Sequence, residues 1–137
     1  MLLLKKACRD NNMAMVFITH NFGLVADICD KVTVLYGGHV MEQGSCEDVF
    51  YATAHPYTRA LMQAIPKADL LSNERLVAIE GAPLDPLNPP PGCPFAPRCT
   101  KAMAICHQRC PAPAELTPGH SVSCWLTEQH AEVSDNA

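Results

Sequence analysis

Apolar and polar residues in the first half of the chain follow two spacings, one helical and one strand-like. Residues 2–10 are expected to end a helix before the Asn11-Asn12 turn. Residues 21–29 repeat apolar side chains at helical spacing, which predicts a second helix. Residues 31–36 place alternate valines on one face, which is typical of a strand with one buried face.

A hairpin and two further short helices are predicted after this strand. Gly37-Gly38 is a tight-turn signal, and residues 39–43 are the expected returning strand. Ser45 followed by Asp48 is a helix N-cap pattern that predicts a helix over about 46–52. Pro56 suits the first turn of the next helix, whose apolar residues fall on one face.

The unbroken apolar run at residues 14–18 predicts a strand buried on both faces, as in a parallel sheet covered by helices. Thr19-His20-Asn21 follows this run directly. Polar residues just beyond the carboxyl end of a parallel strand lie where open α/β sheets bind ligands. His20 is therefore a candidate site residue, although taken alone it is equally well a strand-end histidine.

The composition changes in the second half of the chain. Prolines accumulate from Pro66 onward and cysteines follow, so we expect a linker at residues 66–75, a small irregular region at 76–125 and a loose tail at 126–137. With 48% apolar residues, 18% charged residues and a net charge of −4, the chain is globular. No basic run favours a nucleic-acid partner, and no segment reaches the length of a membrane span.

Three segments resemble the end of an ABC-transporter ATPase domain: Ile18-Thr19-His20-Asn21, residues 25–32, and residues 35–44, which contain Tyr36-Gly37-Gly38. The resemblance implies an α/β fold in which residues 1–65 are the C-terminal part of a P-loop NTPase domain. It also implies that His20 is the switch histidine that contacts the γ-phosphate and the attacking water. Asn21 departs from the Asp that is usual in the family, which removes a charge beside this histidine.

Several elements that such an ATPase needs are missing from the sequence. None of the seven glycines is followed by Lys, so there is no G-x-x-x-x-G-K-[ST] loop for phosphates. The sequence also contains no LSGGQ-like signature and no strand that ends in Asp-Glu. We expect these elements to precede Met1 in a parent protein that uses ATP and Mg²⁺, and we expect the chain alone not to hydrolyse ATP.

Residues 55–66 resemble the HPYTxxLLxAxP segment of oligopeptide, dipeptide and nickel importer ATPases, and residues 91–99 resemble the same subfamily's Cys-rich tail. His55 and Tyr57 are expected to cap and pack a helix rather than to act in catalysis. The resemblance implies import of peptides driven by ATP hydrolysis. The implied partners are a second ABC ATPase subunit, membrane permease subunits and, indirectly, a periplasmic binding protein, with the subunit on the cytoplasmic side of the inner membrane.

Cysteines crowd the last third of the chain. Cys93, Cys99, Cys106 and Cys124 are separated by five, six and seventeen residues, which is not the paired spacing of common zinc sites. Iron–sulfur clusters accept varied spacing, but free thiols or air-formed disulfides also fit. The resemblance implies that these four residues bind a [4Fe–4S] cluster. Cys110 is additional to the family pattern, either as a substitute ligand or as a bystander.

The sequence leaves three functions open. The first is part of a peptide-transport ATPase, and the second is a stand-alone iron–sulfur or other metal-binding module. The third is a nonfunctional remnant, because strands that lack neighbours expose edges that favour aggregation.

Overall fold

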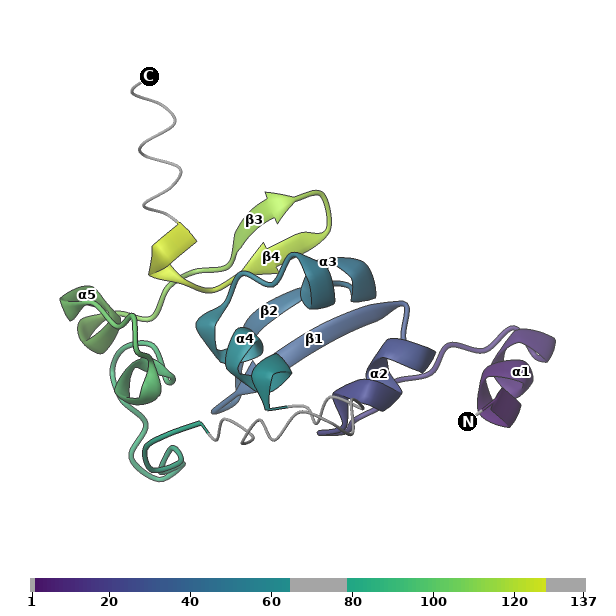
Figure 1. Cartoon of the computed structure of the whole chain (residues 1–137), viewed down its shortest axis with the longest axis horizontal. Helices are drawn as coiled ribbons and strands as arrows, with labels where there is room; N and C mark the ends of the chain where they lie inside the picture. The colour runs from purple at the N-terminus through teal and green to yellow at the C-terminus, as the bar shows by residue number, and fades with distance from the viewer. Residues whose placement is uncertain (1, 65–78, 128–137) are drawn as a thin grey trace, which may run out of the picture.

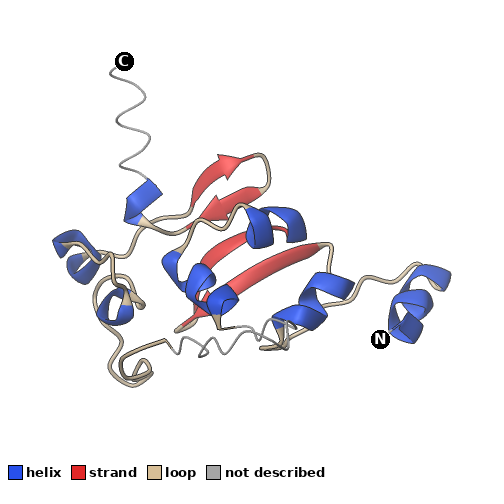
Figure 2. Ribbon diagram, viewed as in Figure 1, coloured by secondary structure: helices blue, strands red, loops and turns tan. Residues whose placement is uncertain are grey.

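The computed structural model describes residues 2–64 and 79–127, and its centre is a four-stranded antiparallel sheet with strand order β1-β2-β4-β3 (Figure 1). The short helices α3 and α4 lie over one face of this sheet, and α5 lies beyond its end (Figure 2). The helices are α1 (Leu2–Asp10), α2 (Phe22–Ile28), α3 (Cys46–Tyr51), α4 (Pro56–Gln63), the 3-10 turn η1 (Ala96–Arg98) and α5 (Ala104–Gln108). The strands are β1 (Lys31–Tyr36), β2 (His39–Ser45), β3 (Ala114–Thr117) and β4 (His120–Val122).

The predicted hairpin is confirmed by β1 and β2, which pair antiparallel across Gly37-Gly38. Gly37 and Gly38 have φ values of 56° and 78°, and this left-handed backbone is the reason for glycine at both turn positions. Val32 and Val34 are both buried on one face of β1, as their alternation predicts. They pack with Val49 of α3, so the hairpin and the helix after it share one apolar cluster.

Polar side chains begin three of the helices. Asn21 Oδ1 accepts the Leu24 N–H at the start of α2. Ser45 and Asp48 form the predicted capping box of α3, in which each side chain accepts the backbone N–H of the other. His55 caps α4 by accepting the Tyr57 N–H at Nδ1, and Pro56 follows in the first turn. The cap roles predicted for Ser45 and His55 are thus confirmed.

The strand predicted at residues 14–18 is wrong. These residues have no regular secondary structure, and Val16 and Ile18 are 91% and 94% exposed. The physical reason is that a parallel strand needs hydrogen-bonding neighbours and covering layers, and nothing in residues 2–64 or 79–127 supplies either to this segment. The apolar run is therefore an uncovered connection between α1 and α2.

The cysteine-rich region contributes to the central sheet, which its composition did not indicate. Strand β4 pairs with β2, with Glu42 opposite Val122, and β3 pairs with β4 across a turn that contains Gly119. The observed fold is accordingly a small mixed α/β unit with one antiparallel sheet that takes strands from both halves of the chain. The predicted linker at 66–75 lies outside the described residues.

A second apolar cluster forms where the cysteine-rich region meets the hairpin. Met41 of β2 packs there with Cys93, Phe95, Ala96 and Cys106, all of which are buried. Aromatic contacts extend the cluster, since the Phe95 ring lies 5.4 Å from Tyr36 and 5.1 Å from Tyr57 between centroids. This packing fixes the cysteine-rich loops against the sheet.

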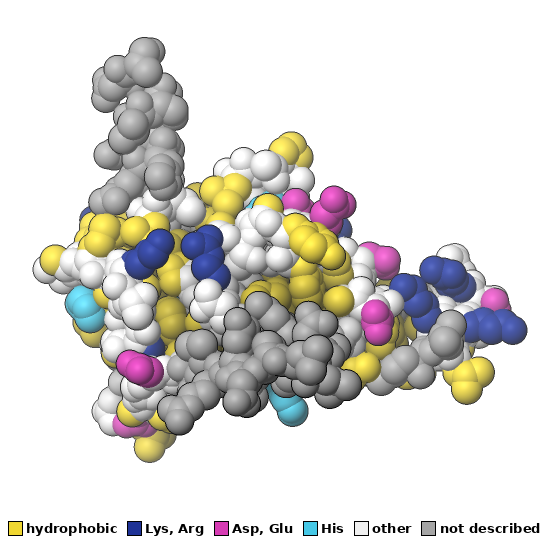
Figure 3. Space-filling model, viewed as in Figure 1, with side chains coloured by type: hydrophobic (Ala, Val, Ile, Leu, Met, Phe, Trp, Pro, Cys, Tyr) yellow, Lys and Arg dark blue, Asp and Glu magenta, His cyan; other side chains and the backbone are white. Residues whose placement is uncertain are grey.

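Among the helices of the described part, none is both long and apolar enough to cross a bilayer. Basic side chains gather at the α1 end of the molecule, at the right of Figure 3, although the whole chain is mildly acidic.

Candidate functional site

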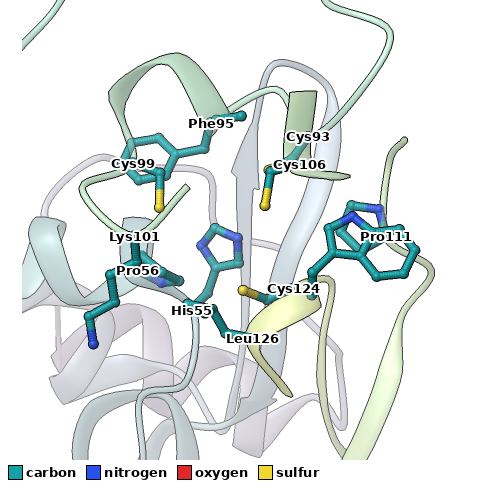
Figure 4. Close-up of a pocket in the computed structure, with 12 residues that line it drawn as sticks. His55, Pro56, Cys93, Phe95, Cys99, Lys101, Cys106, Pro111, Cys124 and Leu126 are labelled. Atoms are coloured by element: carbon teal, nitrogen blue, oxygen red, sulfur yellow. The ribbon is translucent and has the colours of Figure 1, made fainter. Parts of the chain in front are cut away.

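Four cysteines from the loops around η1, from α5 and from the segment after β4 line one hollow at the end of the sheet. Cys93, Cys99, Cys106 and Cys124 all line one small hollow, about 20 Å³ in volume, that is partly open to solvent. The close-up shows the sulfur atoms of Cys99, Cys106 and Cys124 arranged around a common centre (Figure 4). These are the four residues that the sequence nominated as cluster ligands, and the fold brings them together.

Short backbone hydrogen bonds position these cysteines. The Cys93 N–H donates to the Cys106 carbonyl at 2.8 Å, which joins the loop before η1 to α5. The Cys99 N–H closes the η1 turn by donating to the Ala96 carbonyl. Cys124 follows β4 directly, so the β2–β4 pairing places it. The convergence thus depends on turns and sheet pairing and not on a local cysteine spacing.

Gly92 allows the loop before η1 to approach the backbone of α5 closely. A Cβ atom at this position would collide with the carbonyl oxygen of Cys106 and lie 2.7 Å from the carbonyl carbon of His107. The residue before Cys93 must therefore be glycine for the two loops to touch.

Burial favours the neutral thiol at three of these cysteines. It raises the pKa of Cys93 to about 11, and it also raises the pKa values of Cys99 and Cys124. All eight cysteines lie in the described residues, and each is a free thiol. Binding a metal group here would release protons, because the ligands are thiolates.

The four thiols do not form a site for a single metal ion. Within residues 2–64 and 79–127, no three Cys, His, Asp or Glu side chains lie close enough together to hold one metal ion. In a [4Fe–4S] cluster each thiolate binds a different iron, so the sulfurs stand further apart than around one zinc. Four free thiols around one hollow fit that donor set.

A buried polar network holds His55, which lines the hollow, and sequence reasoning missed this network. Glu42 of β2 is fully buried and accepts the N–H groups of Ala54 and His55 at 2.8 and 3.0 Å. The ring Nε2 of His120 lies 2.9 Å from the Glu42 carboxylate. Burial lowers the pKa of His55 to about 4, so this ring is neutral near pH 7.

Cys110 lies apart from the four pocket cysteines. It is exposed and lines a second hollow with His39, whose Nδ1 is 3.9 Å from the Cys110 sulfur. Cys110 does not line the main hollow, and its proposed role as a substitute ligand stays a prediction.

His20 is exposed and lies in the connection that leads into α2. The residue after it, Asn21, is the N-cap of α2, and asparagine and aspartate cap helices about equally well. The departure at Asn21 therefore costs the described fold nothing, and the switch role of His20 stays a prediction.

Comparison with known proteins identifies the region that contains the hollow. Residues 41–106 match the family model for the C-terminal region of oligopeptide/dipeptide transporters. The chain contains the C-terminal region of this transporter family. Three of the four pocket cysteines and the whole His55 segment fall within the matched residues.

Relatives of this family align with nearly the whole chain. It is 42% identical over 130 residues to the dipeptide transport ATP-binding protein DppD of Bacillus subtilis, an alignment that covers 95% of the chain and 38% of the relative. It is 45% identical over 125 residues to the oligopeptide transport ATP-binding protein OppD of Escherichia coli, covering 91% of the chain and 36% of the relative. The chain thus spans well under half the length of these relatives.

Proposed function

We propose that the chain is the C-terminal part of an ATP-binding subunit that couples ATP hydrolysis to import of peptides across the bacterial inner membrane. The supporting observation is similarity to dipeptide and oligopeptide transport ATP-binding proteins over more than nine-tenths of the chain. In the intact subunit, His20 contacts the γ-phosphate, while the phosphate loop and the magnesium ligands come from the part that this chain does not span.

The partners follow from this role. A second ATP-binding subunit supplies the other half of the nucleotide site, and membrane permease subunits form the path for the peptide. A periplasmic binding protein delivers the peptide and meets the ATP-binding subunit only indirectly. The subunit is cytoplasmic and peripheral on the inner membrane, held there by the permeases.

Equilibrium dialysis of the 137-residue chain against MgATP is expected to show no tight binding. The reason is that a phosphate site in this family needs a Gly-rich loop with its lysine, and the sequence contains none. DppD of Bacillus subtilis, which is named as an ATP-binding protein, serves as the positive control. A dissociation constant for the chain comparable to that of the control would contradict the assignment of His20 to a site that is incomplete here.

We further propose that Cys93, Cys99, Cys106 and Cys124 bind a [4Fe–4S] cluster. The supporting observation is that all four cysteines line one hollow although they lie far apart along the chain. When bound, such a cluster ties the loops together and accepts or donates one electron. A small region with a modest apolar core gains stability from such a tie, since metal binding contributes directly to folding.

Replacing one pocket cysteine tests this assignment. Cys124→Ser is expected to lower the iron bound per chain after anaerobic reconstitution at least tenfold, because serine is a poor ligand for this cluster type. Cys8→Ser is the matched control, because Cys8 lies in α1 and does not line the hollow. Iron is measured by metal analysis, and equal iron in both variants would refute the ligand assignment.

The second candidate function is a metal-binding module that acts without nucleotide. It is favoured by one observation, namely that the described residues alone assemble the four-cysteine hollow. The two functions are separated by peptide uptake in the source organism. Loss of uptake on deletion of the gene supports the transport role, and unchanged uptake together with bound iron supports the module.

A further inference from the structure

His55 occupies a position in the cysteine hollow that its capping role does not explain. Its side chain is only 1% exposed, yet it lines the same hollow as the four cysteines. In Figure 4 the imidazole ring projects into the space between the sulfur atoms of Cys99, Cys106 and Cys124. A group bound by those sulfurs would therefore lie against this ring.

The hydrogen bond that His55 accepts defines which of its two ring nitrogens carries the proton. Nδ1 accepts the Tyr57 N–H at 3.0 Å, so this nitrogen has no proton of its own. An imidazole whose Nδ1 accepts a hydrogen bond carries its ring proton on Nε2. Nε2 must then be the donor.

The Nε2–H group has no acceptor among the described residues. None of the hydrogen bonds found in residues 2–64 and 79–127 uses it. Because His55 lines an open hollow, a ligand bound there can accept this N–H group. The surrounding side chains are thiols, which suit a sulfur-rich ligand.

The ring is held in place before any ligand arrives. The buried Glu42 carboxylate accepts the backbone N–H groups of Ala54 and His55, which fixes the chain just before α4. The Phe95 ring packs beside the imidazole, with centroids 6.1 Å apart. Because the His55 side chain is already fixed, its N–H group binds an acceptor without a further loss of conformational entropy.

From this geometry we infer that His55 Nε2–H donates a hydrogen bond to a sulfur of the iron–sulfur cluster that the four cysteines hold. The inference rests on the cluster proposed above. His55 is in this account a positioning residue and not a ligand. Its N–H stabilises negative charge on the sulfur, so it favours the reduced cluster and raises the reduction potential.

Two substitutions separate this role from helix capping. His55→Asn keeps a side-chain acceptor for the Tyr57 N–H, because asparagine is a good N-cap, but its amide is too short to reach the hollow. His55→Gln places an amide N–H group near the position of Nε2. His107→Asn is the control, because His107 is exposed and lies beside Cys106 outside the hollow.

The experiment is a redox titration of the anaerobically reconstituted chain, followed by EPR. We expect His55→Asn to retain its iron and to favour the oxidised cluster at least tenfold, a shift of about 59 mV to lower potential for one electron. His55→Gln should restore much of that shift, and His107→Asn should leave the potential unchanged. An unchanged potential in His55→Asn with full iron content would overturn the inference while leaving the cluster assignment intact.

A measurement on the unsubstituted chain covers the case in which His55→Asn fails to fold. Pulsed EPR of the reduced cluster, with ¹⁵N-labelled histidine, should show weak coupling to one imidazole nitrogen. No coupling, or the strong coupling of a nitrogen bound directly to iron, would overturn the hydrogen-bond assignment. A wild-type chain that takes up no iron would overturn the cluster and this inference together.

Discussion

Gly92→Ala is expected to destabilise the chain by about 3 kcal/mol or more, because the new methyl group has no space and the surrounding atoms cannot yield. The Cβ atom would overlap the backbone of Cys106 and His107, and backbone moves far less readily than the end of a side chain. The collision also separates Cys93 from Cys106, whose backbones are joined by a 2.8 Å hydrogen bond. We expect faster alkylation of both thiols and a lower urea midpoint in circular dichroism.

Gly119→Ala is the matched control for this substitution. Gly119 lies in the β3–β4 turn with φ of 86°, and a methyl group added there would meet nothing within 4 Å, so only backbone strain of about 1–2 kcal/mol is expected. Its thiols should react as in the unsubstituted chain. Equal losses of stability in the two variants would show that Gly92 does not approach α5 as closely as the structure has it.

Glu42→Ala is expected to cost about 3–5 kcal/mol, because it removes the acceptor of several buried donors, each of which costs about 1–3 kcal/mol when left unsatisfied. The substitution leaves the N–H groups of Ala54 and His55 without their acceptor in a buried place, and it leaves His120 without its carboxylate. Such a loss is a large part of the total stability of a small domain. Chemical denaturation followed by circular dichroism measures it.

Glu115→Ala provides the comparison for Glu42→Ala. The Glu115 carboxylate also accepts a backbone N–H, from Gly119 at 2.8 Å, but this contact is exposed to water. We expect a loss of about 1 kcal/mol or less, because water replaces the carboxylate. If Glu42→Ala were as mild as this control, the buried network would not be what holds His55 at the hollow.

The local structure of the first half of the chain could be predicted because it is determined by nearby residues. Alternating valines predict β1, Gly37-Gly38 predicts the turn, and the Ser45 and Asp48 pair predicts the start of α3. Residues 14–18 show the limit of this reasoning. An apolar run predicts burial only if other elements cover it, and that cover is not a property of the run itself.

The position of the second half of the chain relative to the first could not be predicted from the sequence. The strand β4 joins β2 from almost eighty residues away, with Glu42 opposite Val122, and no periodicity encodes that pairing. The Pro118-Gly119 pair was an available turn signal for the β3–β4 hairpin. The four cysteines nominated from the sequence line one hollow, whereas Glu42 and His120 gave no local sign of their burial.

The most direct test of the account is the iron and acid-labile sulfide content of the anaerobically purified chain. We predict about four of each per chain, as a [4Fe–4S] cluster requires. The four pocket cysteines should then resist alkylation while Cys8 and Cys110 react. A chain without iron and sulfide, with Cys93, Cys99, Cys106 and Cys124 all open to alkylation, would contradict the account.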